Sequence, residues 1–83
     1  MEKEKMLSIA NKLNLYVVLS DVEAFVEFRR RDDSFSIFFV HFDKRYTRGN
    51  RFFSIYDWQS DEIIESLFNK AKNVIAGRAL LDE

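Results

Sequence analysis

The sequence contains no cysteine and no proline, and only two of its 83 residues are glycine. The absence of cysteine excludes a disulfide framework and thiolate chemistry. It is compatible with a reducing compartment, and we expect a cytoplasmic location. Because so few residues interrupt regular structure, the chain should form its helices and strands with short turns between them.

Long apolar runs are also missing. No stretch approaches the ~20 apolar residues that span a membrane, so we expect no membrane partner. The charged segment Met1–Lys5 leads into a helical pattern rather than an apolar run, so we expect no secretion signal. With 47% hydrophobic and 33% charged residues, the composition predicts one folded domain over residues 1–83.

Two segments have the periodicity of amphipathic helices. In Glu2–Leu13, apolar residues recur every three or four positions, and Asn14 is suited to end the helix. The second helix should begin after Ser60, a favourable N-cap, and end at Gly77. Residues 78–83 form a short apolar tail, in which Leu80 and Leu81 are a further candidate contact. The apolar stripe of the second helix, expected to pack on the sheet, includes Ile63, Ile64, Leu67, Phe68 and Val74.

The segments between the helices have strand patterns. The stretch from Val22 alternates in polarity, Phe35–Phe42 is apolar on both faces, and Arg51–Trp58 alternates again. The short β-branched and aromatic run Leu15–Ser20 is an additional candidate strand. The sequence therefore predicts an α+β fold of order α-β-β-β-α, with an antiparallel sheet of three or four strands. Both terminal helices should lie on one face of that sheet.

Aromatic residues are more numerous than one sheet face needs. The chain has nine Phe, three Tyr and one Trp, most of them within the predicted strands. Core packing alone is one explanation. Our preferred interpretation is that the second sheet face binds a protein partner or another copy of the chain, because monomers rarely expose large apolar patches. The predicted partner-binding residues are Phe38, Val40, Phe42, Phe52, Tyr56 and Trp58.

The net charge of −1 hides a basic middle segment. Residues 29–51 contain seven basic and three acidic side chains, whereas the segments on either side are acidic. The basic residues flank two turns at opposite ends of the Phe35–Phe42 strand, about 25 Å apart. We interpret them as solvated charges or contacts to an acidic protein partner, with phosphate contacts as the alternative. They are Arg29, Arg30 and Arg31 at one turn, and Lys44, Arg45, Arg48 and Arg51 at the other.

Signatures of catalysis are weak. His41 is the only histidine, and Asp43 would share its strand face. A general base needs a partner and a pocket, and a strand-end histidine near solvent is the simpler interpretation. The carboxylates from Asp57 to Glu65 are explained by helix capping rather than by metal binding. We therefore expect no enzymatic activity, no cofactor and no metal.

These observations favour a small, non-enzymatic protein-binding module. A short chain without cysteine or recognisable motifs would suit an accessory or inhibitor protein of a phage or other mobile element. The alternative is a nucleic-acid-binding module that uses the two basic turns. The element order is similar to that of double-stranded RNA-binding domains, and Lys70–Lys72 resembles the basic final helix of that family. However, the family's Gly-Pro loop is missing, and Asp61 and Glu62 stand where the family has lysines. We assign the chain to no family.

Overall fold

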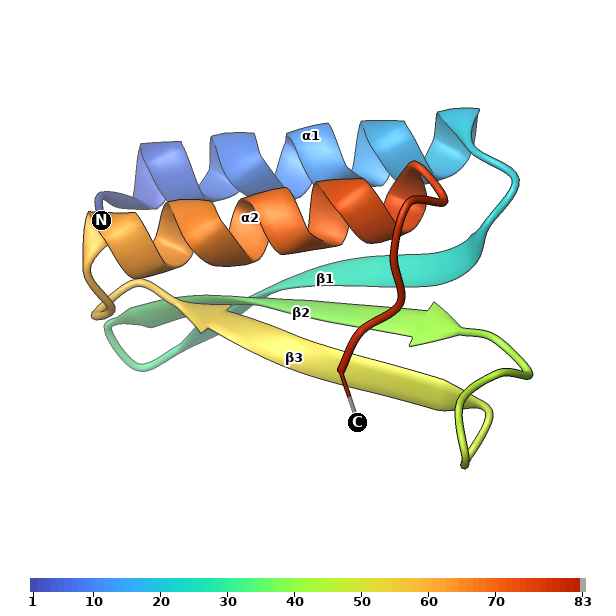
Figure 1. The fold of residues 1–83 in the computed structure, drawn as a ribbon. Helices are drawn as coiled ribbons and strands as arrows, with labels where there is room; N and C mark the ends of the chain where they lie inside the picture. The colour runs from blue at the N-terminus through green and yellow to red at the C-terminus, as the bar shows by residue number, and fades with distance from the viewer. Residues whose placement is uncertain (83) are drawn as a thin grey trace.

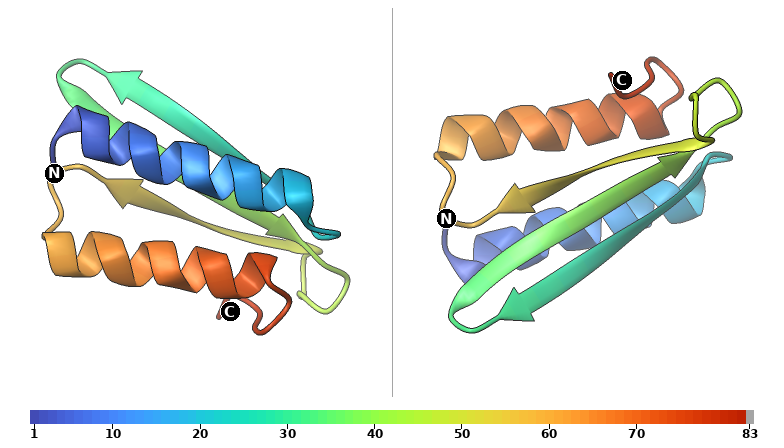
Figure 2. Two further views of the ribbon diagram at one scale, coloured as in Figure 1. Left: turned by 90° about the horizontal axis from the view of Figure 1, so that it is seen from above. Right: turned by 90° about the horizontal axis from the view of Figure 1, so that it is seen from below.

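A computed structural model describes residues 1–82 and has the element order α-β-β-β-α (Figure 1). The three strands form one antiparallel sheet in the order β1-β2-β3, and both helices cover the same face of it (Figure 2). The predicted fold class is confirmed, with three strands rather than four in the described part of the chain. The elements are α1 (Lys3–Leu19), β1 (Glu23–Arg31), β2 (Ser34–Phe42), β3 (Asn50–Tyr56) and α2 (Asp61–Ile75).

Helix α1 is longer than the sequence indicated, and the predicted strand Leu15–Ser20 is wrong. Leu13 is fully buried and Val17 is half-buried, so the core-facing positions keep the helical spacing beyond Asn14. The other aliphatic residues of this strand-like run are exposed on the outer side of the helix. Their exposed fractions are 54% for Leu15, 78% for Val18 and 77% for Leu19.

The β1–β2 hairpin determines which side chains of these two strands face the helices. Its two-residue loop contains Asp32 with φ = 55°, a conformation that Asp tolerates well. Beyond the loop, β1 and β2 pair one residue for one from Arg31↔Ser34 to Glu23↔Phe42. Because side chains alternate along a strand, this register places Ile37 and Phe39 under the helices, where both are fully buried.

Helix α2 has the predicted ends. The Ser60 hydroxyl accepts a hydrogen bond from the Ile63 N–H at 3.2 Å. At the other end Gly77 has φ = 78°, and the Gly77 and Arg78 N–H groups close a Schellman motif. One packing prediction is wrong. Ile63 is 49% exposed, whereas its neighbour Ile64 is fully buried, because only Ile64 lies on the face that contacts the core.

The C-terminal segment folds back onto the domain. Leu81 is only 6% exposed, and its N–H donates a hydrogen bond to the Tyr46 hydroxyl at 2.8 Å. Leu80 is half-buried against the same core. The prediction that Leu80 and Leu81 offer a second contact surface is therefore corrected, since this segment helps to close the protein's own core.

Candidate functional site

The sheet has one face that neither helix covers (Figure 2). The strand registers align Phe25, Val40 and Phe52 directly across this face. The six residues predicted to bind a partner all lie on this side, and Phe25 joins them. We call this surface the open face, and its apolar and aromatic residues are Phe25, Phe38, Val40, Phe42, Phe52, Tyr56 and Trp58.

The open face carries a continuous patch of rings. Phe25 lies 6.0 Å from both Phe38 and Phe42 between ring centroids, and Phe38 lies 5.4 Å from Phe52. These rings cover Val40, which is only 5% exposed although no helix lies over it. The outer rings remain accessible, since Phe52 is 60% exposed. The patch is therefore apolar, and its rings contact one another.

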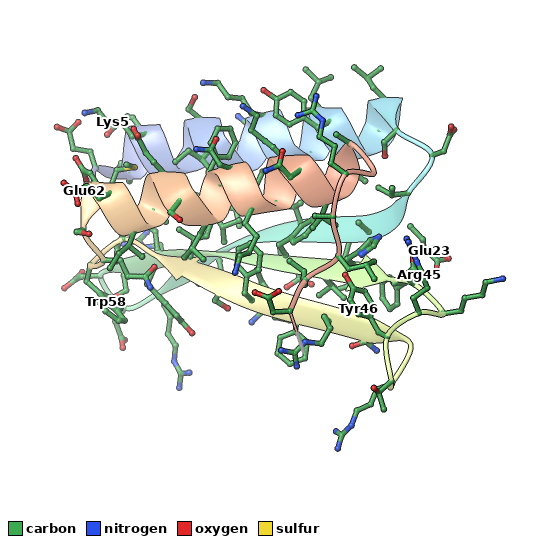
Figure 3. The ribbon with its side chains drawn as sticks, viewed as in Figure 1. Lys5, Glu23, Arg45, Tyr46, Trp58 and Glu62 are labelled. Carbon is green, nitrogen blue, oxygen red and sulfur yellow. The ribbon has the colours of Figure 1, made fainter. Side chains whose placement is uncertain are left out.

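A second aromatic pair lies at the opposite end of this face. Tyr56 and Trp58 stack with centroids 5.3 Å apart and an interplanar angle of 17°. Trp58 was predicted to end the last strand but lies in the turn beyond β3, and it is 72% exposed. Figure 3 shows Trp58 at one end of the molecule, with Glu23 and Arg45 at the other.

Arginine side chains border the Tyr56–Trp58 pair. The Arg29 guanidinium lies 4.4 Å from the centroid of the Phe38 ring and forms an ion pair with Glu27 at 2.8 Å. Arg31 follows two residues later and is exposed. Together with Arg30, Asp32 and three serines, these residues line a hollow beside Trp58. The serines are Ser34, Ser36 and Ser54.

The remaining basic residues do not form one surface. Arg30 occupies a position of β1 on the helix side of the sheet. Its guanidinium lies 5.9 Å from the Phe35 ring centroid, and its Nε donates a hydrogen bond to the Asp32 carbonyl. At the other end of β2, Arg45 is paired with Asp43 and Arg51 donates to the Asp82 carbonyl, whereas Lys44 and Arg48 are exposed. The predicted separation into two groups at opposite ends of β2 follows from the antiparallel registers.

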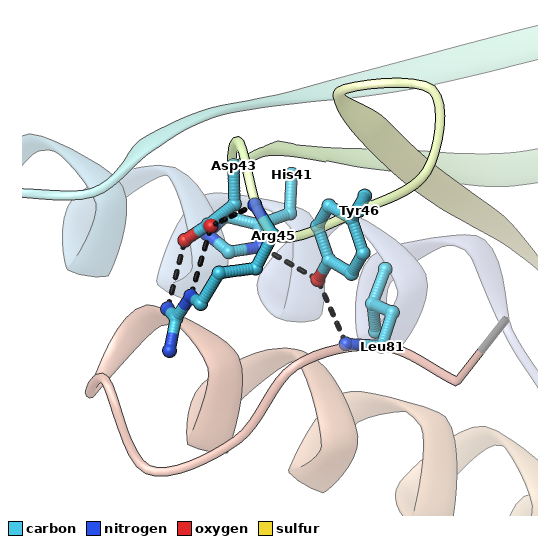
Figure 4. A network of polar contacts seen from close by, with 5 residues as sticks. All are labelled: His41, Asp43, Arg45, Tyr46 and Leu81. Atoms are coloured by element: carbon cyan, nitrogen blue, oxygen red, sulfur yellow. Dashed lines mark hydrogen bonds and ion pairs between the residues drawn. The ribbon is translucent and has the colours of Figure 1, made fainter.

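His41 is buried, which corrects the prediction of a histidine near solvent. It is 3% exposed, and its Nδ1 lies 2.8 Å from the Tyr46 hydroxyl (Figure 4). The Leu81 N–H donates to the same hydroxyl, so the hydroxyl proton is available to donate to His41. Burial lowers the pKa of His41, which favours the neutral ring that this hydrogen bond needs.

The Asp43 side chain is bound by Arg45. Its carboxylate accepts two hydrogen bonds from the Arg45 side chain and one from the Arg45 N–H (Figure 4). These bonds hold the pKa of Asp43 well below its usual range. The Asp43–Arg45 bonds lie within the β2–β3 connection, and the bond from the Leu81 N–H to the Tyr46 hydroxyl links that connection to the C-terminal segment.

A groove that the sequence did not predict runs between the C-terminal ends of the two helices. Tyr16 and Leu19 of α1 line one side, and Lys72 and Asn73 of α2 line the other. Its residues come from distant parts of the chain, so no local pattern could have indicated it. Elsewhere in residues 1–82, no group of three His, Asp or Glu residues is placed to hold a metal ion. None of the helices in this range is long and apolar enough to cross a membrane.

No protein-family model, no curated protein and no solved structure matches this chain.

Proposed function

We propose that this chain is a small, non-enzymatic protein-binding module that docks a folded protein on its open face. The observation that carries the proposal is the accessible ring patch on the side of the sheet away from the helices. Monomers rarely expose contiguous apolar patches of this kind without a binding role. Aromatic residues surrounded by weaker contacts are also the usual centres of binding energy in protein interfaces.

The charges around the open face define the partner's chemistry. Arg29 and Arg31 lie at the end that carries Trp58, while Glu23 lies at the opposite end of β1. A complementary partner would present an apolar centre, with carboxylates opposite the arginines. Such rim charges would mainly set the association rate and the register of docking.

An accessory or inhibitor role in a phage or other mobile element is the biological setting that we propose for this module. The small size and the absence of cysteine support that setting and a cytoplasmic location, by analogy of general character.

The experiment compares capture of proteins by variants that differ only in the surface they alter. Phe52→Ser removes an exposed ring from the open face, and Ile63→Ser removes a similarly exposed apolar side chain from α2. We expect the wild type and Ile63→Ser to capture a protein partner even after nuclease treatment. Phe52→Ser should not capture it. Equal retention by both variants would refute the open face as the binding surface.

A nucleic-acid-binding module is the second candidate, and the stacked Tyr56–Trp58 pair beside Arg29 and Arg31 favours it. Exposed rings next to cations can stack bases and contact phosphates. We prefer the protein partner because the two basic groups lie at opposite ends of β2 and the rest of the chain is acidic.

The salt dependence of binding separates the two candidates. Phosphate contacts would give an affinity that falls steeply with salt, with a log–log slope of about −0.9 per phosphate neutralised on B-DNA. Replacing Arg29, Arg30 and Arg31 with Ala would then weaken binding to all sequences alike. We expect no tight complex with DNA or RNA at physiological salt, and a salt-sensitive complex lost in the triple variant would favour the second candidate.

A further inference from the structure

Within residues 1–82, strand β1 is an outer strand of the sheet and pairs only with β2. It is nine residues long, contains no proline, and pairs with β2 without a bulge. The other outer strand, β3, is shorter, and the C-terminal segment lies beside it (Figure 1), where Arg51 Nε donates to the Asp82 carbonyl at 2.8 Å. A long, regular edge of this kind is a template for pairing with another strand.

The contacts of Phe35 show which backbone groups of β1 point outward. The Phe35 N–H donates to Asp57 Oδ2 at 3.0 Å, and its carbonyl accepts from the Asp57 N–H at 3.1 Å, so both groups point toward β3. Arg30 lies directly opposite Phe35, and its backbone groups therefore point away from the sheet. Alternation along the strand gives the same direction for Ala24, Val26 and Phe28.

We propose that β1 pairs with β1 of a second copy, antiparallel, about a twofold axis at Glu27. Full overlap of the two strands sets Glu23 opposite Arg31 of the other copy. In this register the outward-pointing residues pair with one another, Ala24 with Arg30 and Val26 with Phe28. Each outward N–H and carbonyl of the strand then has a partner, and the two three-stranded sheets become one sheet of six strands.

The side chains agree with this register. Glu23 would face a cation, Arg31, and Phe25 would face the Arg29 guanidinium. Val26 would pack against Phe28, whose ring is 36% exposed in the single chain. Opposite charges and apolar pairs at such positions stabilise antiparallel strands. The single pair of like residues is Glu27 at the axis, and Arg29 of its own chain binds each Glu27 at 2.8 Å.

Helix α1 offers an independent observation on the same side of the molecule. Tyr16 faces α2, since it lines the groove with Asn73. Leu7 and Val18 are separated by three helical turns on the opposite flank, above β1, and are 44% and 78% exposed. A six-stranded sheet would place the two α1 helices antiparallel and adjacent, with Leu7 of one copy near Val18 of the other.

Single cysteines test the pairing directly because the chain has none of its own. In the proposed register the two Glu27 residues form a non-hydrogen-bonded pair with Cα atoms about 4.5 Å apart, within the range for a disulfide. Glu27→Cys should give a covalent dimer on mild oxidation. Ser66→Cys on α2 and Ser54→Cys on the open face should stay monomeric. Cross-linking of Ser54→Cys in place of Glu27→Cys, or equal cross-linking of all three, would overturn the proposal.

A charge exchange tests the register in solution without oxidation. Glu23→Arg or Arg31→Glu alone should raise the dimer dissociation constant severalfold in analytical ultracentrifugation, since each sets like charges opposite one another. The double variant should restore the wild-type constant. A wild type that remains monomeric at high concentration, or a double variant no better than the single ones, would overturn the pairing. Neither result would affect capture of a partner by the open face, which Phe52→Ser tests separately.

Discussion

The Tyr46 hydroxyl connects two segments that are far apart in the sequence. It accepts a hydrogen bond from the Leu81 N–H and lies 2.8 Å from His41 Nδ1, and all three residues are buried. The tyrosine therefore fixes the C-terminal segment against the end of β2. Burial lowers the pKa of His41 and so favours the neutral ring that accepts this hydrogen bond.

Tyr46→Phe should lower the free energy of unfolding by about 1–3 kcal/mol, because it leaves the Leu81 N–H and His41 Nδ1 buried without their partner. Tyr56→Phe is the matched control, since Tyr56 is 40% exposed. Urea denaturation of both variants checks the prediction. Equal small changes in the two midpoints would contradict this role of Tyr46.

The stability of the protein should also depend on pH through His41. Burial lowers the pKa of folded His41, whereas an unfolded histidine titrates near the ordinary value of 6.5. Between these two pKa values the unfolded state binds more protons, so the free energy of unfolding rises with pH. The stabilisation linked to neutral His41 is complete above about pH 6.5. It is lost as the pH falls from there through the pKa of the folded protein.

Denaturation midpoints at about pH 7.5 and 5.5 measure this effect. We expect the wild type to lose stability toward the lower pH and His41→Gln to show a smaller difference between the two. A dependence that is unchanged in His41→Gln would assign the effect to other groups.

At the scale of single elements, helix α2 provides a comparison within one sequence. Ile63 and Ile64 are adjacent, but the first is 49% exposed and the second is fully buried. Ile64→Ala should lower the free energy of unfolding by about 2–5 kcal/mol, because it leaves a cavity in the core. Ile63→Ala should cost far less. Thermal or urea denaturation of the two variants checks the difference, and similar losses would mean that the helix is rotated from its described position.

The strands and α2 could be predicted from the sequence because alternation and capping residues are local signals. Phe38, Val40 and Phe42 were placed on one face of β2, and Ser60 and Gly77 were recognised as the ends of α2. The end of α1 could not be predicted in this way, because β-branched residues in its C-terminal turns resemble a strand pattern. Tertiary packing at Leu13 and Val17 overrides that local preference.

At the scale of the whole molecule, the sequence predicted a second apolar sheet face and six of its residues, but not the contribution of Phe25. The residue set was found because alternation separates the two faces of each strand. The hollow beside Trp58 and the network of His41, Tyr46 and Leu81 depend on contacts between distant segments, for which the sequence carries no local pattern. We therefore assign stability to the helical side of the sheet and propose the other side for binding.

Site-specific photocross-linking in the source cell tests that assignment most directly. A photoreactive phenylalanine analogue at position 52, where the native ring is 60% exposed, should give a covalent adduct with a protein that persists after nuclease treatment. The same analogue at Leu15, which is 54% exposed on α1, is the matched control and should not give that adduct. A protein adduct from position 15 but not from position 52, or an adduct at position 52 that contains only nucleic acid, would contradict the account.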